Sequence, residues 1–171
     1  LNSSRVDNYD TIETRGEGSH GMVASGDSWA YNFNDVTTYG NAAFGMYALN
    51  SSFIYNYGAE SIETWGDGSH GMVAENGSYA YNDGSVTTHG YDAHGMYAFG
   101  GSTIYNTNAG DNRGVVRTEG AGSHGMVADG SGSTAHVNSS NVVTNGDNSF
   151  GMYALNGGLV YNHFGGLVRT N

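Results

Sequence analysis

Three histidines recur at nearly regular intervals, and their side chains are able to bind metal. His70, His94 and His124 each precede a Gly-Met pair. If successive repeats stack as parallel strands, these imidazoles lie about 5 Å apart, and imidazole nitrogen is a common zinc ligand. Phe44 and Phe150 hold the same position in other repeats. A position that accepts Phe is suited to packing, so we predict no metal site here.

Acidic residues raise a second kind of cation chemistry. The turns Gly66-Asp67-Gly68-Ser69 and Gly146-Asp147-Asn148 are rich in oxygen ligands of the type that Ca²⁺ prefers. However, the ten Asp and six Glu are spread singly over many turns, without an EF-hand loop or a GGxGxD repeat. We therefore expect solvated turn carboxylates and no cofactor, with weakly bound surface Ca²⁺ as the alternative.

A pair of glutamates is the best candidate for catalysis. Glu13 and Glu63 hold equivalent positions two repeats apart, which corresponds to about 10 Å between stacked strands and is near the separation of the two carboxylates in an inverting glycosidase. A β-helical enzyme would interrupt its repeat at the active site, and this repeat continues regularly through that region. We predict that the chain is not an enzyme.

Aromatic residues recur in columns that are expected to face outward. The first column contains Tyr31, Tyr55, Tyr81, Tyr105 and Tyr161, with Asp7 and Val137 as its other members. A second contains Tyr47, Tyr97 and Tyr153, and Tyr39 and Trp65 belong to a third. Such stripes either bind glycans or a partner protein or stabilise the sheet through neighbour packing. The sequence leaves both readings open.

The elements that position these columns are internal repeats. All six methionines occupy one position of a His/Phe-Gly-Met-Val/Tyr-Ala motif: Met22, Met46, Met72, Met96, Met126 and Met152, spaced by 24, 26, 24, 30 and 26 residues. A threonine column runs in step and contains Thr14, Thr38, Thr64, Thr88, Thr118 and Thr144, with Thr170 as a seventh member. An asparagine column contains Asn8, Asn32, Asn56, Asn82, Asn106, Asn138 and Asn162.

Each unit of about 25 residues carries three short β-prone segments separated by turns. This pattern predicts an all-β fold, a right-handed parallel β-helix with three short strands per coil and six to seven coils. A β-propeller is the main competitor, but it would require antiparallel hairpins. Strand alternation places Met22 and Ala24 inside and Glu13 outside.

The units alternate, because Val23, Val73 and Val127 share a column with Tyr47, Tyr97 and Tyr153. We therefore divide residues 1–171, taken as a single β-helical fragment, into double-coil repeats 1–48, 49–98 and 99–154 and a partial repeat 155–171. Both ends fall inside the repeat, so we expect a piece of a longer solenoid.

Charge and composition exclude several partners. The net charge is −11, with five Arg and no Lys, so a basic patch for nucleic acid or anionic lipid is not expected. No apolar run is long enough to cross a bilayer, and the chain contains no Cys.

The segment Val86-Thr87-Thr88-His89-Gly90 followed by His94-Gly95-Met96-Tyr97-Ala98 resembles the passenger repeats of bacterial autotransporter adhesins, a resemblance that covers nearly the whole chain. It implies export by a C-terminal barrel and extracellular or outer-membrane display, with a role in adhesion, autoaggregation or biofilm formation. The partner is then a second copy, or glycans or proteins of a host or bacterial surface. A structural filament of rods joined end to end is the alternative, and a carbohydrate-active enzyme is a third hypothesis.

Overall fold

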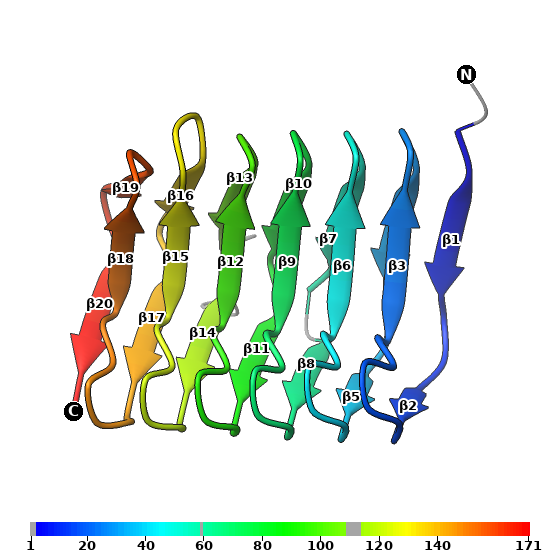
Figure 1. Cartoon of the computed structure of the whole chain (residues 1–171), viewed down its shortest axis with the longest axis horizontal. Helices are drawn as coiled ribbons and strands as arrows, with labels where there is room; N and C mark the ends of the chain where they lie inside the picture. The colour runs from blue at the N-terminus through cyan, green and yellow to red at the C-terminus, as the bar shows by residue number, and fades with distance from the viewer. Residues whose placement is uncertain (1–2, 59, 109–113) are drawn as a thin grey trace.

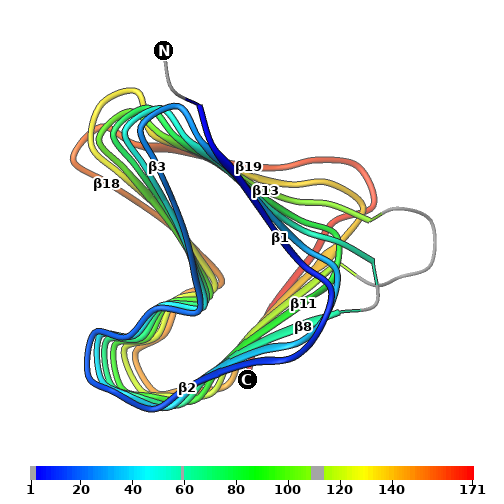
Figure 2. The ribbon, with the colours of Figure 1, turned by 90° about the vertical axis from the view of Figure 1, so that its right-hand side faces the viewer.

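The computed structural model describes residues 3–58, 60–108 and 114–171. These residues form twenty short β-strands and no helix. Successive coils lie side by side along one axis, with the N-terminal coil at one end and the C-terminal coil at the other (Figure 1). Seen from the N-terminal end, the chain turns clockwise as it recedes, which makes the β-helix right-handed (Figure 2).

Every third strand belongs to the same parallel sheet. Sheet A contains β1 (Arg5–Asn8), β4 (Trp29–Asn32), β7 (Phe53–Asn56), β10 (Tyr79–Asn82), β13 (Thr103–Asn106), β16 (Thr134–Val137) and β19 (Leu159–Asn162). Sheet B contains β2 (Ile12–Thr14), β5 (Val36–Thr38), β8 (Ser61–Thr64), β11 (Ser85–Thr88), β14 (Val115–Thr118), β17 (Asn141–Thr144) and β20 (Leu167–Thr170). Sheet C contains β3 (Met22–Ser25), β6 (Met46–Leu49), β9 (Met72–Glu75), β12 (Met96–Phe99), β15 (Met126–Asp129) and β18 (Met152–Leu155).

The predicted β-helix is confirmed, with three strands per coil and about 26 residues per turn. All strand pairs are parallel, as in the pairing of Met96 with Met72 and Met126, which excludes a propeller. The six methionines align in one interior column, and those of β3, β6, β9, β12 and β15 are buried. Ala of sheet C, Val and Ile of sheet B, and Ala and Ile of sheet A complete the core.

Polar ladders satisfy the interior corners. An amide ladder runs from Asn8 to Asn106, in which each Nδ2 donates to the Oδ1 of the next coil at 2.8–2.9 Å. Five members of the threonine column, from Thr14 to Thr118, close the turn after sheet B, because each hydroxyl donates to a carbonyl five residues later, as from Thr38 to Ala43 and from Thr118 to Ser123, both at 2.6 Å. The buried Thr144 hydroxyl makes no such bond. A serine ladder, which the sequence did not suggest, accepts the N–H of the preceding coil's serine, as Ser78 accepts from Ser52 at 3.0 Å.

Steric crowding requires the glycine of the His/Phe-Gly-Met motif. A Cβ on Gly95 would collide with the Val116 side chain and would lie 2.7 Å from the Gly125 carbonyl oxygen. The chain turns inward just before it enters the strands of sheet C (Figure 2), so a side chain at this glycine would push neighbouring coils apart.

Two predicted positions are wrong. The sequence predicts Val137 outside, in the tyrosine column, but it is buried and aligns with Asn106 and Asn162, while His136 lies next to Tyr105. Consequently Asn138 lies outside the asparagine ladder. A buried Val cannot continue a chain of amide bonds, so the ladder stops at Asn106, whose Nδ2 donates to the carbonyls of Gly114 and Asn141 instead.

Candidate functional site

The outer side of sheet A gathers aromatic side chains in adjacent rows, and we call these rows together the sheet A face. The first strand position places Trp29, Phe53 and Tyr79 in register, followed by Thr103, Thr134 and Leu159. The third strand position aligns Tyr31, Tyr55, Tyr81, Tyr105, His136 and Tyr161. Tyr9, Phe33 and Tyr57 form a shorter row directly after the strands, with ring centroids 5.0 and 4.7 Å apart.

Rings in the tyrosine row stack on one another along the axis of the β-helix. Tyr81 and Tyr105 have centroids 4.5 Å apart, and His136 continues the stack at 4.7 Å from Tyr105 and 4.9 Å from Tyr161. Tyr55 is parallel to Tyr81 within 4° at 5.9 Å. Because the faces of these rings meet neighbouring rings, the edges are directed toward solvent.

The sheet A face carries almost no charge. Strands β4, β7, β10, β13, β16 and β19 contain no Asp, Glu, Lys or Arg. In β1, Arg5 and Asp7 neutralise each other at 2.7 Å, and the guanidinium lies 4.4 Å from the centroid of the Tyr31 ring.

One acid at the margin of this face is covered, whereas others such as Asp27 and Asp35 are exposed. Asp83 is only 7% exposed and accepts hydrogen bonds from the hydroxyls of Tyr55 and Thr107. Burial and the nearby carboxylate raise the pKa of Tyr55 well above its usual range, so the Tyr55 hydroxyl stays a donor at neutral pH.

The second predicted stripe is not continuous. Tyr47, Tyr97 and Tyr153 lie on alternate strands of sheet C, separated by valines. Val73 and Val127, each flanked by tyrosines on both neighbouring strands, are buried although they point out of the core. The alternation of large and small residues therefore closes this surface, and the rings are half-buried.

Two of these tyrosines donate a hydrogen bond to an acidic side chain on the next coil. The Tyr47 hydroxyl donates to Glu75, and the Tyr97 hydroxyl donates to Asp129 at 2.9 Å. Burial and the hydrogen bond raise the pKa of both tyrosines to about 12. These contacts explain the double repeat. A coil with an outward tyrosine is followed by a coil that has a small outward residue beside the ring and a carboxylate that accepts the hydrogen bond of the hydroxyl.

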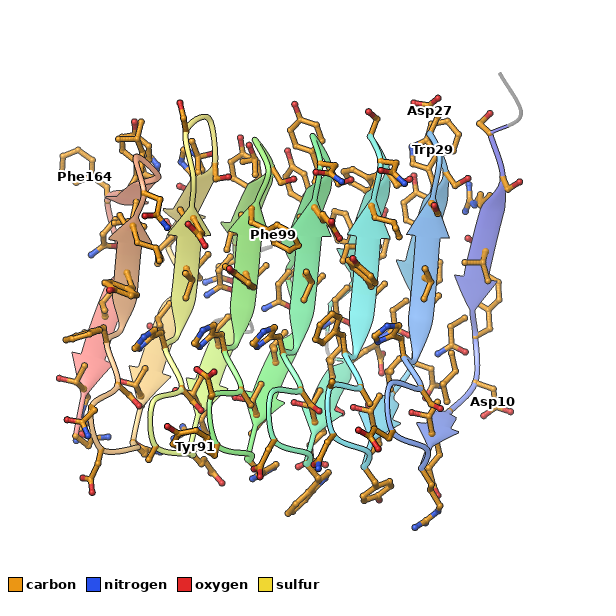
Figure 3. The ribbon with its side chains drawn as sticks, in the orientation of Figure 1. Asp10, Asp27, Trp29, Tyr91, Phe99 and Phe164 are labelled. Carbon is orange, nitrogen blue, oxygen red and sulfur yellow. The ribbon has the colours of Figure 1, made fainter. Side chains whose placement is uncertain are left out.

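A ring ladder lies beside these tyrosines and contains His20, Phe44, His70, His94, His124 and Phe150, with successive centroids 4.8–5.2 Å apart. The side chains follow one another coil by coil (Figure 3). Tyr97 packs edge-on against His70 and His94 at 5.3 and 5.6 Å. The ladder therefore packs the corner between the turn and sheet C.

The Nδ1 atoms of the ring-ladder histidines already accept hydrogen bonds from the backbone of the next coil. Nδ1 of His70 accepts the His94 N–H at 2.9 Å, and Nδ1 of His94 accepts the His124 N–H at 3.1 Å. Burial lowers the pKa of His70 to about 4, and burial and the neighbouring imidazoles lower that of His94 to about 3. In the part of the chain that the structure describes, no three His, Asp or Glu side chains are placed to share a metal ion.

A third group lies at the corner after sheet B. Arg15 covers Tyr39 at 4.6 Å, Tyr39 lies 6.4 Å from Trp65, and Trp65 stacks on His89 at 3.8 Å. His89 bridges Glu63 at 3.0 Å and Glu119 at 2.6 Å.

The glutamates considered as a candidate for catalysis occupy one outward column, with Thr37 between Glu13 and Glu63. Glu13 pairs with Arg15 at 2.5 Å, so each glutamate is bound to a different partner. In one of the two turns considered for calcium, Oδ1 of Asp67 accepts the Tyr91 N–H at 2.8 Å.

The sequence predicts only one of the three rows of the sheet A face. The rows of Trp29, Phe53 and Tyr79 and of Tyr9, Phe33 and Tyr57 were not predicted. Strand alternation alone would have predicted the first row, because the residue two positions before an outward tyrosine on the same strand also points outward. His136 has the same signal, since Thr134-Ala135-His136 matches Tyr79-Ala80-Tyr81.

The comparison with protein-family models finds the BigA third pectate lyase-like domain, in two overlapping matches over residues 1–110 and 34–166. The chain belongs to this family. The family model describes a β-helix-type domain of a bacterial surface protein. No curated protein and no solved structure matches the chain.

The two overlapping matches of the BigA-type domain agree with the repeat, because the family pattern fits the chain in two positions along the axis. The family's name refers to pectate lyase and assigns no reaction to this chain. Within the described residues, no helix is long and apolar enough to cross a membrane.

Proposed function

We propose that this chain is a non-enzymatic adhesive rod, displayed on the bacterial surface as part of an autotransporter adhesin, and that its adhesive surface is the sheet A face. The observation that carries the proposal is a row of six strands without a charged residue in a chain of net charge −11. Exposed aromatic surface of this extent is typical of interaction sites.

The ring contacts alone do not account for the exposure of this face. Trp29 and Tyr79 remain 40% and 47% exposed in the first row, although larger burial would stabilise the sheet more. Membership of a family of surface domains supports display, and the regular rungs support a rigid rod that holds the face away from the cell.

The test displays the chain on non-adherent bacteria and measures adhesion to surfaces and settling of the cells. Trp29→Ser with Tyr79→Ser should abolish both. Tyr39→Ser with Trp65→Ser is a matched control, because it removes the same two residue types at equal exposures of 40% and 47%. Full adhesion by the sheet A variant would overturn the proposal, and filaments that persist in it would favour end-to-end assembly.

The non-enzymatic part has its own test. Glu63 lies beside His89 and Trp65 on an exposed corner, so it is the acid to change if the chain cleaves polysaccharide. We expect no turnover of acidic or neutral polysaccharides by the unchanged chain. Turnover that disappears in Glu63→Gln would contradict the proposal and assign catalysis to this corner.

A further inference from the structure

We propose that the partner of the sheet A face is the same face on a second copy of this chain, packed sheet against sheet. This inference rests on the proposed function and specifies its partner. Its first support is charge. Two copies that each carry −11 repel one another, and sheet B and sheet C both carry partly exposed acids on their outer sides, among them Glu63, Glu75 and Asp129. In contrast, strands β4 to β19 of sheet A bring no like charges together.

Ring orientation favours a protein surface over a glycan. A sugar that binds an aromatic side chain stacks on the face of the ring, but the faces in the tyrosine row are covered by neighbouring rings. Tyr81 lies between Tyr55 and Tyr105, and His136 lies between Tyr105 and Tyr161. The exposed edges and hydroxyls instead suit interdigitation with a second aromatic surface, where edge-to-face contacts are favourable.

The size of the face fits weak pairing that is amplified by many copies. Six strands spaced at about 4.8 Å, with four residues at about 3.3 Å each, give a footprint of roughly 29 by 13 Å. This footprint, about 380 Å² on each copy, is below the roughly 800 Å² per partner of a standard specific interface, so a single pair is expected to bind weakly. Rods displayed in large numbers on facing cells would gain strength through avidity.

The pairing should become stronger with salt. The contact itself is uncharged, while the rest of both copies repels, and salt screens that repulsion over about 10 Å at 0.1 M. We expect the dimer dissociation constant of the whole 171-residue chain, measured by sedimentation equilibrium, to fall severalfold between low salt and about 0.5 M NaCl.

Charge can be added to the face without removing a ring. Thr103 and Thr134 lie in register on β13 and β16, on the outer side of sheet A. Thr103→Glu with Thr134→Glu should weaken dimerisation by about tenfold or more through repulsion across the contact. Thr37→Glu with Thr87→Glu adds the same charge to the outer side of sheet B and should leave dimerisation within about twofold.

A charge exchange makes the test independent of folding defects. Thr103→Lys with Thr134→Lys places positive charge at the same positions, and an equimolar mixture of the Lys and Glu variants should form mixed dimers more tightly than either variant alone. Circular dichroism confirms that both variants retain the β-helix.

Three outcomes would overturn the inference: a chain that stays monomeric at all salt concentrations, dimerisation that the Glu variant retains, or a mixture that pairs no better than its components. Failure here is distinguishable from failure of the proposed function. If displayed cells still lose adhesion to a glycan or host surface on Trp29→Ser with Tyr79→Ser, the sheet A face is adhesive and its partner is a different molecule.

Discussion

The histidines of the ring ladder combine a packing surface with a hydrogen-bond acceptor. Phe can replace the ring, as Phe44 and Phe150 do, but only a neutral imidazole can also accept the N–H of the next coil. The ladder therefore requires uncharged histidine. Burial enforces this state, because an imidazolium in the middle of the stack would lose its hydration.

This requirement predicts acid sensitivity. His70 and His94 have folded pKa values of about 4 and about 3, below the ordinary 6.5. Below pH 6.5 the unfolded chain binds more protons than the folded chain, so the stabilisation present above that pH is lost progressively as the pH falls toward 3. The melting temperature should therefore decrease steadily over this range.

The pair His70→Phe and His94→Phe separates these imidazoles from the other titrating groups, among them Asp92, whose Oδ1 lies 3.8 Å from Nε2 of His94. At pH 7.5 the variant should be less stable, because the N–H groups of residues 94 and 124 lose their acceptors. The difference from the unchanged chain should shrink toward pH 4. A constant difference at all pH values would contradict the role given to the imidazoles.

The tyrosines of sheet C allow ring packing and hydrogen bonding to be measured separately. Tyr97→Phe removes the bond to Asp129 and should cost about 1 kcal/mol in free energy of unfolding. Tyr97→Val also removes the ring next to Val73 and Val127 and should cost about 2–4 kcal/mol. Urea titration measures both, and equal losses would show that the ring contributes nothing beyond its hydroxyl.

At the scale of the strand, repetition determines how much the sequence can predict. Where coils differ little in length, the spacing predicts which residues align in one column, and the predicted methionine and threonine columns are correct. The predicted asparagine column is wrong at β16, because the turn after Asp129 is one residue longer than its equivalents and Asn138 follows Val137 as Asn follows Tyr in other coils. Hydrogen bonds between coils, such as Tyr97 to Asp129, depend on side-chain reach and were not predictable from spacing.

The asparagine ladder makes a prediction at the same scale. Asn56 is buried, accepts from Asn32 and donates to Asn82. Asn56→Ala leaves a buried donor and a buried acceptor unpaired and should cost about 2–4 kcal/mol. Asn41 is exposed and accepts one N–H bond, from Asp67, so Asn41→Ala should cost less than about 0.5 kcal/mol in the same urea titration. Similar losses in the two variants would show that the ladder has no special role.

For the whole molecule, the coils form a one-dimensional array in which each contacts its neighbours. Stability should then depend on which coils are adjacent as well as on how many there are. Deleting residues 49–98 removes one double repeat and brings the Tyr47 coil next to the Val127 coil, with Asp129 in the position of Glu75. Deleting residues 75–98 removes a single coil and brings the Val73 coil next to the Val127 coil, with no tyrosine between them.

The two deletions give opposite expectations if the double coil is the structural unit. The 49–98 deletion should unfold cooperatively, with stability reduced in proportion to its length. The 75–98 deletion retains more coils. In a plot of free energy of unfolding against chain length, it should nevertheless fall below the line that joins the unchanged chain and the 49–98 deletion. The reason is that two outward valines lose the tyrosine ring between them. A 75–98 deletion that lies on this line would show that single coils are interchangeable and that the alternation of Val and Tyr carries no energy.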